Sequence, residues 1–196
     1  MSTQLLQPPT FPSTSETLHR SQLAPRVLSE LAPSTLPYPL SLLFESDTPE
    51  KWNSYENLFY SCLRTGDNAS ALRCIQQLQK RFGLDNERVM GLMGMYQEAV
   101  AKDEKELEQQ VAIYREFIRQ KPTNLVIRKR LVALLKSMSR SSEAVGALVE
   151  LLDLSPVDAE SWAELAELYF GQGLYAQAVY CYEDVLLTTP NAWNVS

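Results

Sequence analysis

The sequence has few of the residues on which most active sites and metal sites depend. Its 196 residues include one histidine, His19, which lies in a leader rich in proline, serine and threonine. This nearly removes histidine-based catalysis and histidine-ligated metals from the folded part. The three cysteines, Cys62, Cys74 and Cys181, form no Cys-x-x-Cys pair; so odd and sparse a set argues against a disulfide framework and suits a reducing compartment. We therefore expect no catalytic residue, no cofactor and no metal ligand.

Long apolar runs and an excess of basic charge are also missing. No stretch of about 18 consecutive apolar residues exists, which predicts that no helix spans a membrane. The start at Met1–Pro9 lacks the basic residues and the apolar run of a signal peptide. The net charge is −6, the opposite of what a binder of phosphate backbones normally carries. We expect a soluble cytosolic protein that binds no nucleic acid and reaches a membrane only through a partner.

Residues 1–47 differ from the rest of the chain. They hold most of the eleven prolines, and an internal proline removes a donor and clashes with the preceding turn, so we expect no long helix here. One short helix is predicted at Pro25–Leu31, with proline at its first position. The apolar patch Leu36–Phe44 either docks on the body or belongs to a floppy leader. The interpretation is a poorly ordered N-terminal extension.

From about residue 49 the pattern becomes helical, with apolar residues three and four apart. Pro122, Pro156 and Pro190 recur at one constant interval, which equals the period of the tetratricopeptide repeat (TPR), about 34 residues. The prediction is an all-α fold: a TPR α-solenoid of about four helix pairs over 48–190, followed by a tail at 191–196. The expected repeats are approximately 49–86, 87–124, 125–158 and 159–192.

The last repeat fits the TPR pattern most closely, and the earlier ones depart from it in places. Arg128 stands at the tryptophan position of the third repeat. The first helix of the first repeat is predicted to be about a turn too long, and extra charged residues at Ala101–Glu108 are expected to lengthen the helices or the turn of the second. The residues predicted to pack the repeats together are Trp52, Gly94, Pro122, Pro156, Trp162, Ala166, Tyr169, Ala178, Tyr182 and Pro190.

Charge is distributed unevenly along the folded part. Arg140 is the last basic residue, and nine acidic residues follow it, whereas 125–142 holds five basic residues and no acid. Such polarity either serves solubility or forms a docking surface for partners of matched charge. On the second interpretation, the residues predicted to bind a partner are Arg128, Lys129, Arg130, Lys136, Lys80 and Arg81.

Other patterns favour structure over chemistry. Glu160, Glu164 and Glu167 share one helical face, and a carboxylate pair could act as a general acid and base, but nothing apolar converges there, so a solvated face is expected. Gly91 and Gly94 lack the following Lys-Ser/Thr of a phosphate loop and favour close helix packing. No repeat shows the lysine and asparagine pair with which chaperone-binding TPR proteins hold a C-terminal carboxylate.

Several segments together carry a family resemblance. These are Leu72–Leu78, Arg88–Ala99, Lys121–Asn124 with Arg128–Arg130, Trp162–Tyr169, Tyr175–Ala178 and Cys181–Glu183. Over roughly 50–190 the chain resembles the second subunit of the endoplasmic reticulum (ER) membrane protein complex, in particular a shortened, fungal-like member.

The resemblance implies a non-enzymatic TPR scaffold on the cytosolic face of the ER membrane. In that family the complex inserts transmembrane segments without nucleotide, and this subunit braces membrane-embedded subunits and another cytosolic subunit. The alternative is a cytosolic TPR adaptor that holds client or chaperone peptides. The leader 1–47 does not resemble the family's start, and family members continue past the position of Ser196, so a fragment or a shortened gene model is expected.

Overall fold

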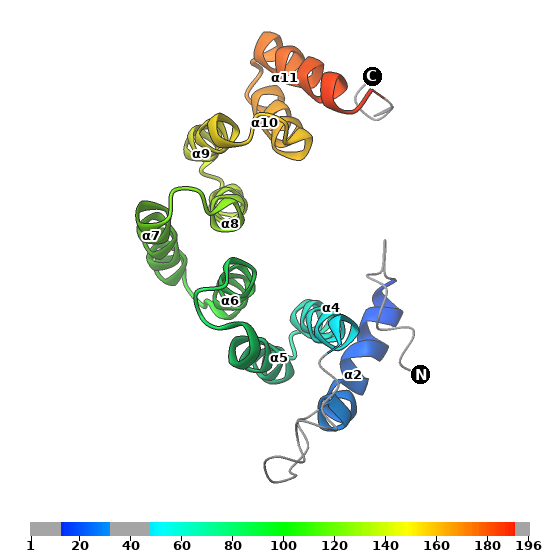
Figure 1. Ribbon diagram of the computed structural model, residues 1–196. Coiled ribbons are helices and arrows are strands. Elements are labelled where there is room, and N and C mark those ends of the chain that lie inside the picture. Colours follow the sequence, from blue (N-terminus) through cyan, green and yellow to red (C-terminus); the bar gives the residue numbers. More distant parts are fainter. Residues whose placement is uncertain (1–12, 32–47, 191–196) are drawn as a thin grey trace. The chain divides into compact units, whose positions relative to one another are not determined.

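The structure, a computed structural model, describes residues 13–31 and 48–190. Within these ranges every regular element is a helix, as the sequence predicted (Figure 1). The chain divides into two compact units, residues 1–100 and 101–196. The boundary falls inside the predicted second repeat, 87–124. The division into four repeats stays a prediction, and the tail 191–196 lies outside the described residues.

The first unit contains α2 (Thr14–Leu31), α4 (Pro49–Thr65), α5 (Asn68–Phe82) and α6 (Glu87–Val100). Helix α4 packs on α2 and α5, and α5 packs on α6. The core between them includes fully buried Tyr55, Leu58, Phe59, Ile75 and Leu78. With 17 residues, α4 is four residues longer than α8 (Leu125–Ser137), which has 13. That is about one helical turn, so the predicted extra turn in the first helix is confirmed.

Helix α2 corrects the expectation for the leader. It has 18 residues and contains Pro25 in its interior, whereas the sequence predicted a helix only over Pro25–Leu31. The expected cost of an internal proline is about 3 kcal/mol. Packing on α4 offsets it, because Ala24 is fully buried in the core and Thr65 Oγ1 donates a 2.7 Å hydrogen bond to Ser21 Oγ. The patch Leu36–Phe44 lies outside the described residues.

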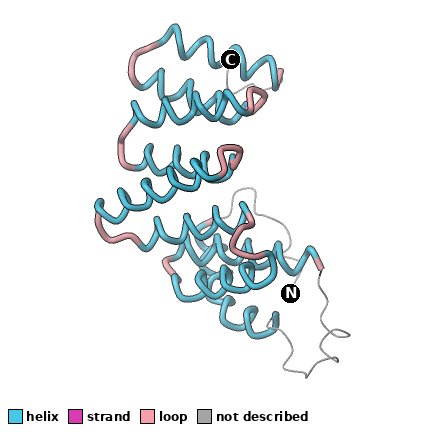
Figure 2. The backbone as a smooth tube through the Cα atoms, turned by 60° about the vertical axis from the view of Figure 1, so that its left-hand side comes forward, coloured by secondary structure: helices cyan, strands magenta, loops and turns pink. Residues whose placement is uncertain are grey.

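The second unit contains α7 (Glu104–Gln120), α8, α9 (Ser141–Leu154), α10 (Ala159–Gly171) and α11 (Tyr175–Thr188). Figure 2 shows successive helices joined by short loops at alternating ends. The bounds of α10 and α11 lie one TPR period after those of α8 and α9, and α9 ends one period after α7. Residues of α9, α10 and α11 can therefore be compared with residues one TPR period earlier in the chain. We call the earlier residue the counterpart of the later one.

The turns between paired helices show this equivalence. Gly173, between α10 and α11, has φ 76°, and its counterpart Ser139, between α8 and α9, has φ 59°. Both turns close with the same backbone bond: Arg140 N donates to Leu135 O at 2.9 Å, and Leu174 N donates to Tyr169 O at 3.0 Å. Glycine adopts this left-handed conformation freely, whereas Ser139 holds it at a cost.

The predicted packing residues fall into three groups. Gly94, Ala166 and Ala178 are buried, which lets helix backbones approach closely. The aromatic side chains are half-buried: Trp52 stacks on Tyr55, and Trp162, Tyr169 and Tyr182 pack against the core of α8 to α11. The third group, Pro122, Pro156 and Pro190, is exposed after the ends of α7, α9 and α11.

Candidate functional site

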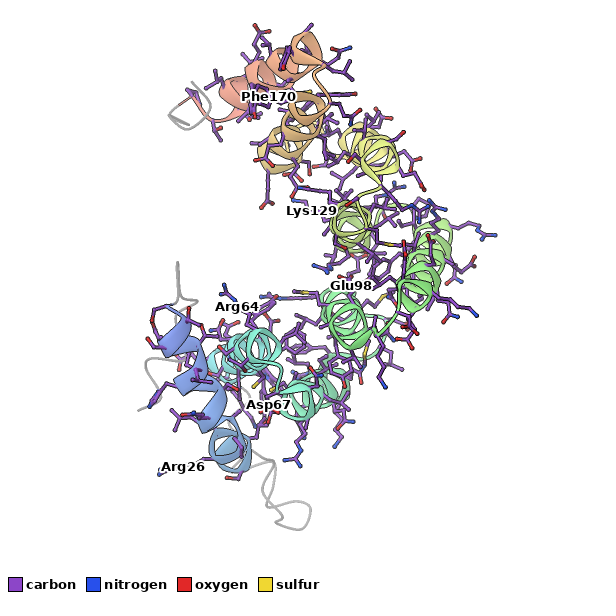
Figure 3. The ribbon with its side chains drawn as sticks, turned by 180° about the vertical axis from the view of Figure 1, so that it is seen from behind. Arg26, Arg64, Asp67, Glu98, Lys129 and Phe170 are labelled. Carbon is purple, nitrogen blue, oxygen red and sulfur yellow. The ribbon has the colours of Figure 1, made fainter. Side chains whose placement is uncertain are left out.

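Three of the basic residues predicted to bind a partner are ion-paired inside the second unit. Lys129 is labelled on α8 in Figure 3, and its Nζ lies 2.7 Å from Asp158 Oδ2 and 3.0 Å from Glu160 Oε2 at the start of α10. Lys136 Nζ lies 3.5 Å from Glu164 Oε2, and Arg128 Nη1 lies 3.1 Å from Glu150 Oε2. Three basic side chains of α8 are therefore neutralised by four of the carboxylates that follow it, those of Glu150, Asp158, Glu160 and Glu164.

The Lys129–Asp158 pair is electrostatically reinforced. Burial alone would lower the pKa of Lys129, but hydrogen bonds to Asp158 and Glu160 outweigh it and leave that pKa raised. Burial would likewise raise the pKa of Asp158, but the hydrogen bonds from Lys129 and Ser161 outweigh it and leave that pKa lowered. Asp158 also caps α10 by accepting from Ser161 N. Both side chains thus stay charged at neutral pH, and one contact ties α8 to the start of α10.

A second network links α7 to α9. Arg115 Nη2 on α7 lies 2.6 Å from Glu143 Oε2, and Arg140 Nη1 lies 2.6 Å from Glu108 Oε1. Arg140 also binds Glu143, and the arginines Arg140 and Arg115 lower the pKa of the Glu143 carboxyl. Helices α7 to α10 are thus connected by charge as well as by apolar packing.

The other three residues predicted to bind a partner are Arg130, Lys80 and Arg81. Arg130 is half-buried on α8. Lys80 and Arg81 are exposed in the last turn of α5, in the first unit, where cations complement the helix dipole. The Arg81 guanidinium lies 5.5 Å from the centre of the Phe82 ring.

An apolar groove crosses the C-terminal half of the second unit. Helix α10 forms its floor, and α9 and α11 form its walls. Its volume is about 670 Å³. The Trp162 and Tyr180 rings meet edge to face with their centres 6.1 Å apart, and Trp162 Nε1 donates a 2.8 Å hydrogen bond to Pro156 O. The groove is lined by Val149, Leu152, Asp153, Pro156, Trp162, Leu165, Tyr169, Ala176, Gln177, Tyr180 and Cys181.

The counterpart positions in the preceding repeat are occupied very differently. Arg115 and Glu143, the counterparts of Val149 and Gln177, join α7 to α9 by an ion pair. Val149 and Gln177 cannot form such a bridge. The counterpart of Tyr180 is Gly146. Neither Val149 nor Tyr180 stands out within its own helix in the sequence, although a position-by-position comparison of the last two repeats contains the signal.

The cysteines do not provide a nucleophile. Burial raises the pKa of Cys62 to about 11 and that of Cys74 to about 12, and it also raises the pKa of Cys181. All three are buried free thiols, protonated at neutral pH. The described ranges contain no cluster of ligating side chains suited to a metal ion. Of the helices described, none combines the length and the apolar character needed to cross a bilayer.

Comparison with known sequences gives the helices a family. Residues 92–194, more than half of the chain, match the profile of a family described as the EMC2 TPR-like repeat domain. The chain belongs to the ER membrane protein complex subunit 2 family. This confirms the resemblance found in the sequence and, with it, the TPR fold.

Relatives of this ER membrane protein complex subunit 2 family occur in distant eukaryotes. The chain is 36% identical to the TPR repeat protein oca3 of Schizosaccharomyces pombe over 141 residues, 72% of this chain and 48% of that protein. It is 36% identical to ER membrane protein complex subunit 2-A of Xenopus laevis over 140 residues, 71% of this chain and 46% of that protein. The chain thus matches about half the length of these relatives.

Solved structures of TPR proteins share the fold. A thermophilic TPR protein of Thermus thermophilus superposes with a TM-score of 0.58 at 19% identity, covering 91% of this chain and 94% of that one. MamA of Desulfovibrio magneticus superposes with a TM-score of 0.51 at 17% identity, covering 74% of this chain and 78% of that one.

Proposed function

We propose that this chain is a non-enzymatic TPR scaffold of the ER membrane protein complex. It lies on the cytosolic face of the ER membrane, binds membrane-embedded and cytosolic subunits, and so supports energy-independent insertion of transmembrane segments. The observation that carries the proposal is the match of residues 92–194 to this family. The relatives named as subunit 2 of that complex, in Xenopus and in Dictyostelium discoideum, support it.

The electrostatics of the second unit suit a scaffold. A scaffold holds its partners in fixed positions, which requires that its own helices resist sliding past one another. Lys129 bonds α8 to α10, and Arg140 bonds the start of α9 to α7. Side chains used in this way stiffen the unit, so Lys129, Lys136 and Arg128 act on partners through the shape that they stabilise.

Lys80 and Arg81 remain the proposed direct contacts with partner subunits, because both are exposed at the end of α5. The test is purification of the tagged chain from detergent-solubilised ER membranes. The wild-type chain is expected to recover the membrane-embedded subunits, and K80E/R81E is expected to recover several-fold less at unchanged helical circular dichroism. R73E, an exposed reversal on the same helix, is the matched control.

The two parts of this proposal fail separately. If the wild-type chain recovers no membrane-embedded subunit, the scaffold function is wrong. If K80E/R81E recovers as much as R73E, only the assignment of Lys80 and Arg81 is wrong.

A second candidate function, a cytosolic TPR adaptor for client or chaperone peptides, is favoured by the open apolar groove on α10. Recovery after a salt wash separates the two functions. A scaffold stays with the complex at a constant ratio to the other subunits, whereas an adaptor exchanges and is recovered with a mixture of peptides.

A further inference from the structure

We propose that the groove between α9 and α11 binds a short amphipathic helix of a partner protein, with apolar residues three and four apart and lysine or arginine at its flanks. The proposal concerns the surface of the second unit alone and holds whether the partner is a subunit of a complex or a soluble protein.

The floor and walls of the groove are suited to bind apolar side chains of a partner, which we call anchors. Leu152, Trp162 and Leu165 line it, while Val149 and Tyr180 stand 42% and 60% exposed at its rim. Trp162 already donates its indole N–H to Pro156 O, so the floor offers no free donor there. Covering the exposed Val149 and Tyr180 with apolar side chains removes their surface from water and favours binding.

The fold itself does not require this groove to be open. Between α7 and α9, at the counterpart positions, the Arg115–Glu143 ion pair bridges the two walls. Arg128 fills the place of Trp162 there, with its side chain only 11% exposed. The side chains at these positions thus differ between the two repeats: a charged pair joins α7 to α9, whereas Val149 and Gln177 form no such pair between α9 and α11.

The geometry favours a helix as the occupant. The walls are two helices that flank a third, and a further helix packs into such a channel by inserting residues at i, i+3, i+4 and i+7. The wall of α9 that lines the groove runs from Val149 to Asp153, little more than one turn, so two or three anchors fill it.

The charge around the groove selects the flanks of the partner. Asp153 lines the groove, is exposed, and makes no ion pair with any described residue. Glu183, three residues after Tyr180 on α11, is likewise exposed and makes no ion pair with a described residue. The chain has no lysine or arginine after Arg140 to neutralise them. Basic residues on a partner helix would meet these carboxylates as Lys129 meets Asp158 within the unit.

The test uses two synthetic helical peptides with identical leucine positions at i, i+3 and i+4. One carries lysine at the flanks and the other carries glutamate. Fluorescence anisotropy with the full chain is expected to show saturable binding of the lysine peptide and at least about tenfold weaker binding of the glutamate peptide. D153K is expected to reduce this preference several-fold.

V149R/Q177E transfers the bridging pair of the preceding repeat into the groove. This double substitution is expected to weaken the binding of the lysine peptide at least about tenfold, because the new ion pair covers the apolar floor of the groove. Q109R/A112E adds the same two charges at exposed positions of α7 and is expected to leave binding unchanged. If V149R/Q177E does not fold, Y180A removes part of one wall and is expected to weaken binding several-fold.

Three results would overturn the proposal. The first is no binding of either peptide. The second is binding that V149R/Q177E and Y180A leave unchanged, or that does not distinguish lysine from glutamate flanks. The third is sedimentation showing a dimer that V149R/Q177E abolishes, because a second copy of the chain would then occupy the groove.

Discussion

Arg128 Nε and Trp162 Nε1 donate the same hydrogen bond, each at 2.8 Å, to the carbonyl oxygen of the proline six residues earlier, Pro122 or Pro156. The two donors are one TPR period apart and occupy the same position of successive repeats. The arginine that departs from the TPR sequence pattern therefore preserves the bond that the tryptophan makes. The Arg128 side chain therefore packs within its repeat as Trp162 does, and it also forms an ion pair with Glu150.

This equivalence predicts the effect of exchanging the residue. R128W is expected to keep a donor for Pro122 O and to lose only the pair with Glu150, whose side chain is 70% exposed. The free energy of unfolding should then change by less than about 1 kcal/mol. R128A loses the hydrogen bond and the packing and should cost about 1–2 kcal/mol. Urea denaturation followed by circular dichroism measures both, and R128W as destabilising as R128A would contradict the equivalence.

The strained turn at Ser139 predicts a stabilising substitution. Because Ser139 has φ 59° where the next repeat has Gly173, S139G relieves the left-handed strain. The gain is expected to be about 0.5–1 kcal/mol after the greater freedom of glycine in the unfolded chain is subtracted. G173A is expected to lower the free energy of unfolding by about 1 kcal/mol. Thermal denaturation checks both variants; a lower melting temperature for S139G would show that the serine is not strained.

The ion pairs predict how stability depends on pH. The folded state lowers the pKa of Asp158 and of Glu143, so these carboxylates stabilise the fold fully above their unfolded pKa values, about 3.9 and 4.3. This contribution to stability is lost as the pH falls through the lower pKa values that the two carboxyl groups have in the folded state. D158N and E143Q should therefore be less stable than wild type near pH 7, and the difference should shrink below about pH 4. Urea titrations from pH 3 to 7 measure it, and a difference independent of pH would contradict the assignment.

The buried thiols predict slow modification. With pKa values raised by burial to about 11 for Cys62 and about 12 for Cys74, both are protonated at neutral pH and out of contact with water. A thiol reagent such as DTNB at pH 7.5 is expected to react with neither until the chain unfolds in urea. Immediate reaction of either cysteine in the native protein would mean that the first unit opens readily.

The sequence predicted the helices of the second unit well because its signals are local. Pro122 and Pro156 set the period, and apolar residues three and four apart mark each helix. It did not predict the role of Lys129, because its contact with Asp158 joins residues that only the successive packing of α8 on α9 and of α9 on α10 brings together. Nor did it predict the length of α2, because the burial of Ala24 on α4 outweighs the local penalty of Pro25.

Val149 and Tyr180 illustrate a different difficulty. Each is an ordinary residue for its own helix. Its role in the groove can be recognised only when Val149 is compared with Arg115, and Tyr180 with Gly146, at the same positions of the previous repeat. The family was predicted and confirmed, because its segments extend over most of the folded part.

Cross-linking mass spectrometry on the tagged chain, recovered from ER membranes in mild detergent, tests the scaffold function most directly. The scaffold function predicts cross-links from exposed lysines such as Lys80 and Lys105 to cytosolic parts of membrane-embedded subunits, at a constant ratio between preparations. Cross-links only to soluble chaperones and their clients would contradict it.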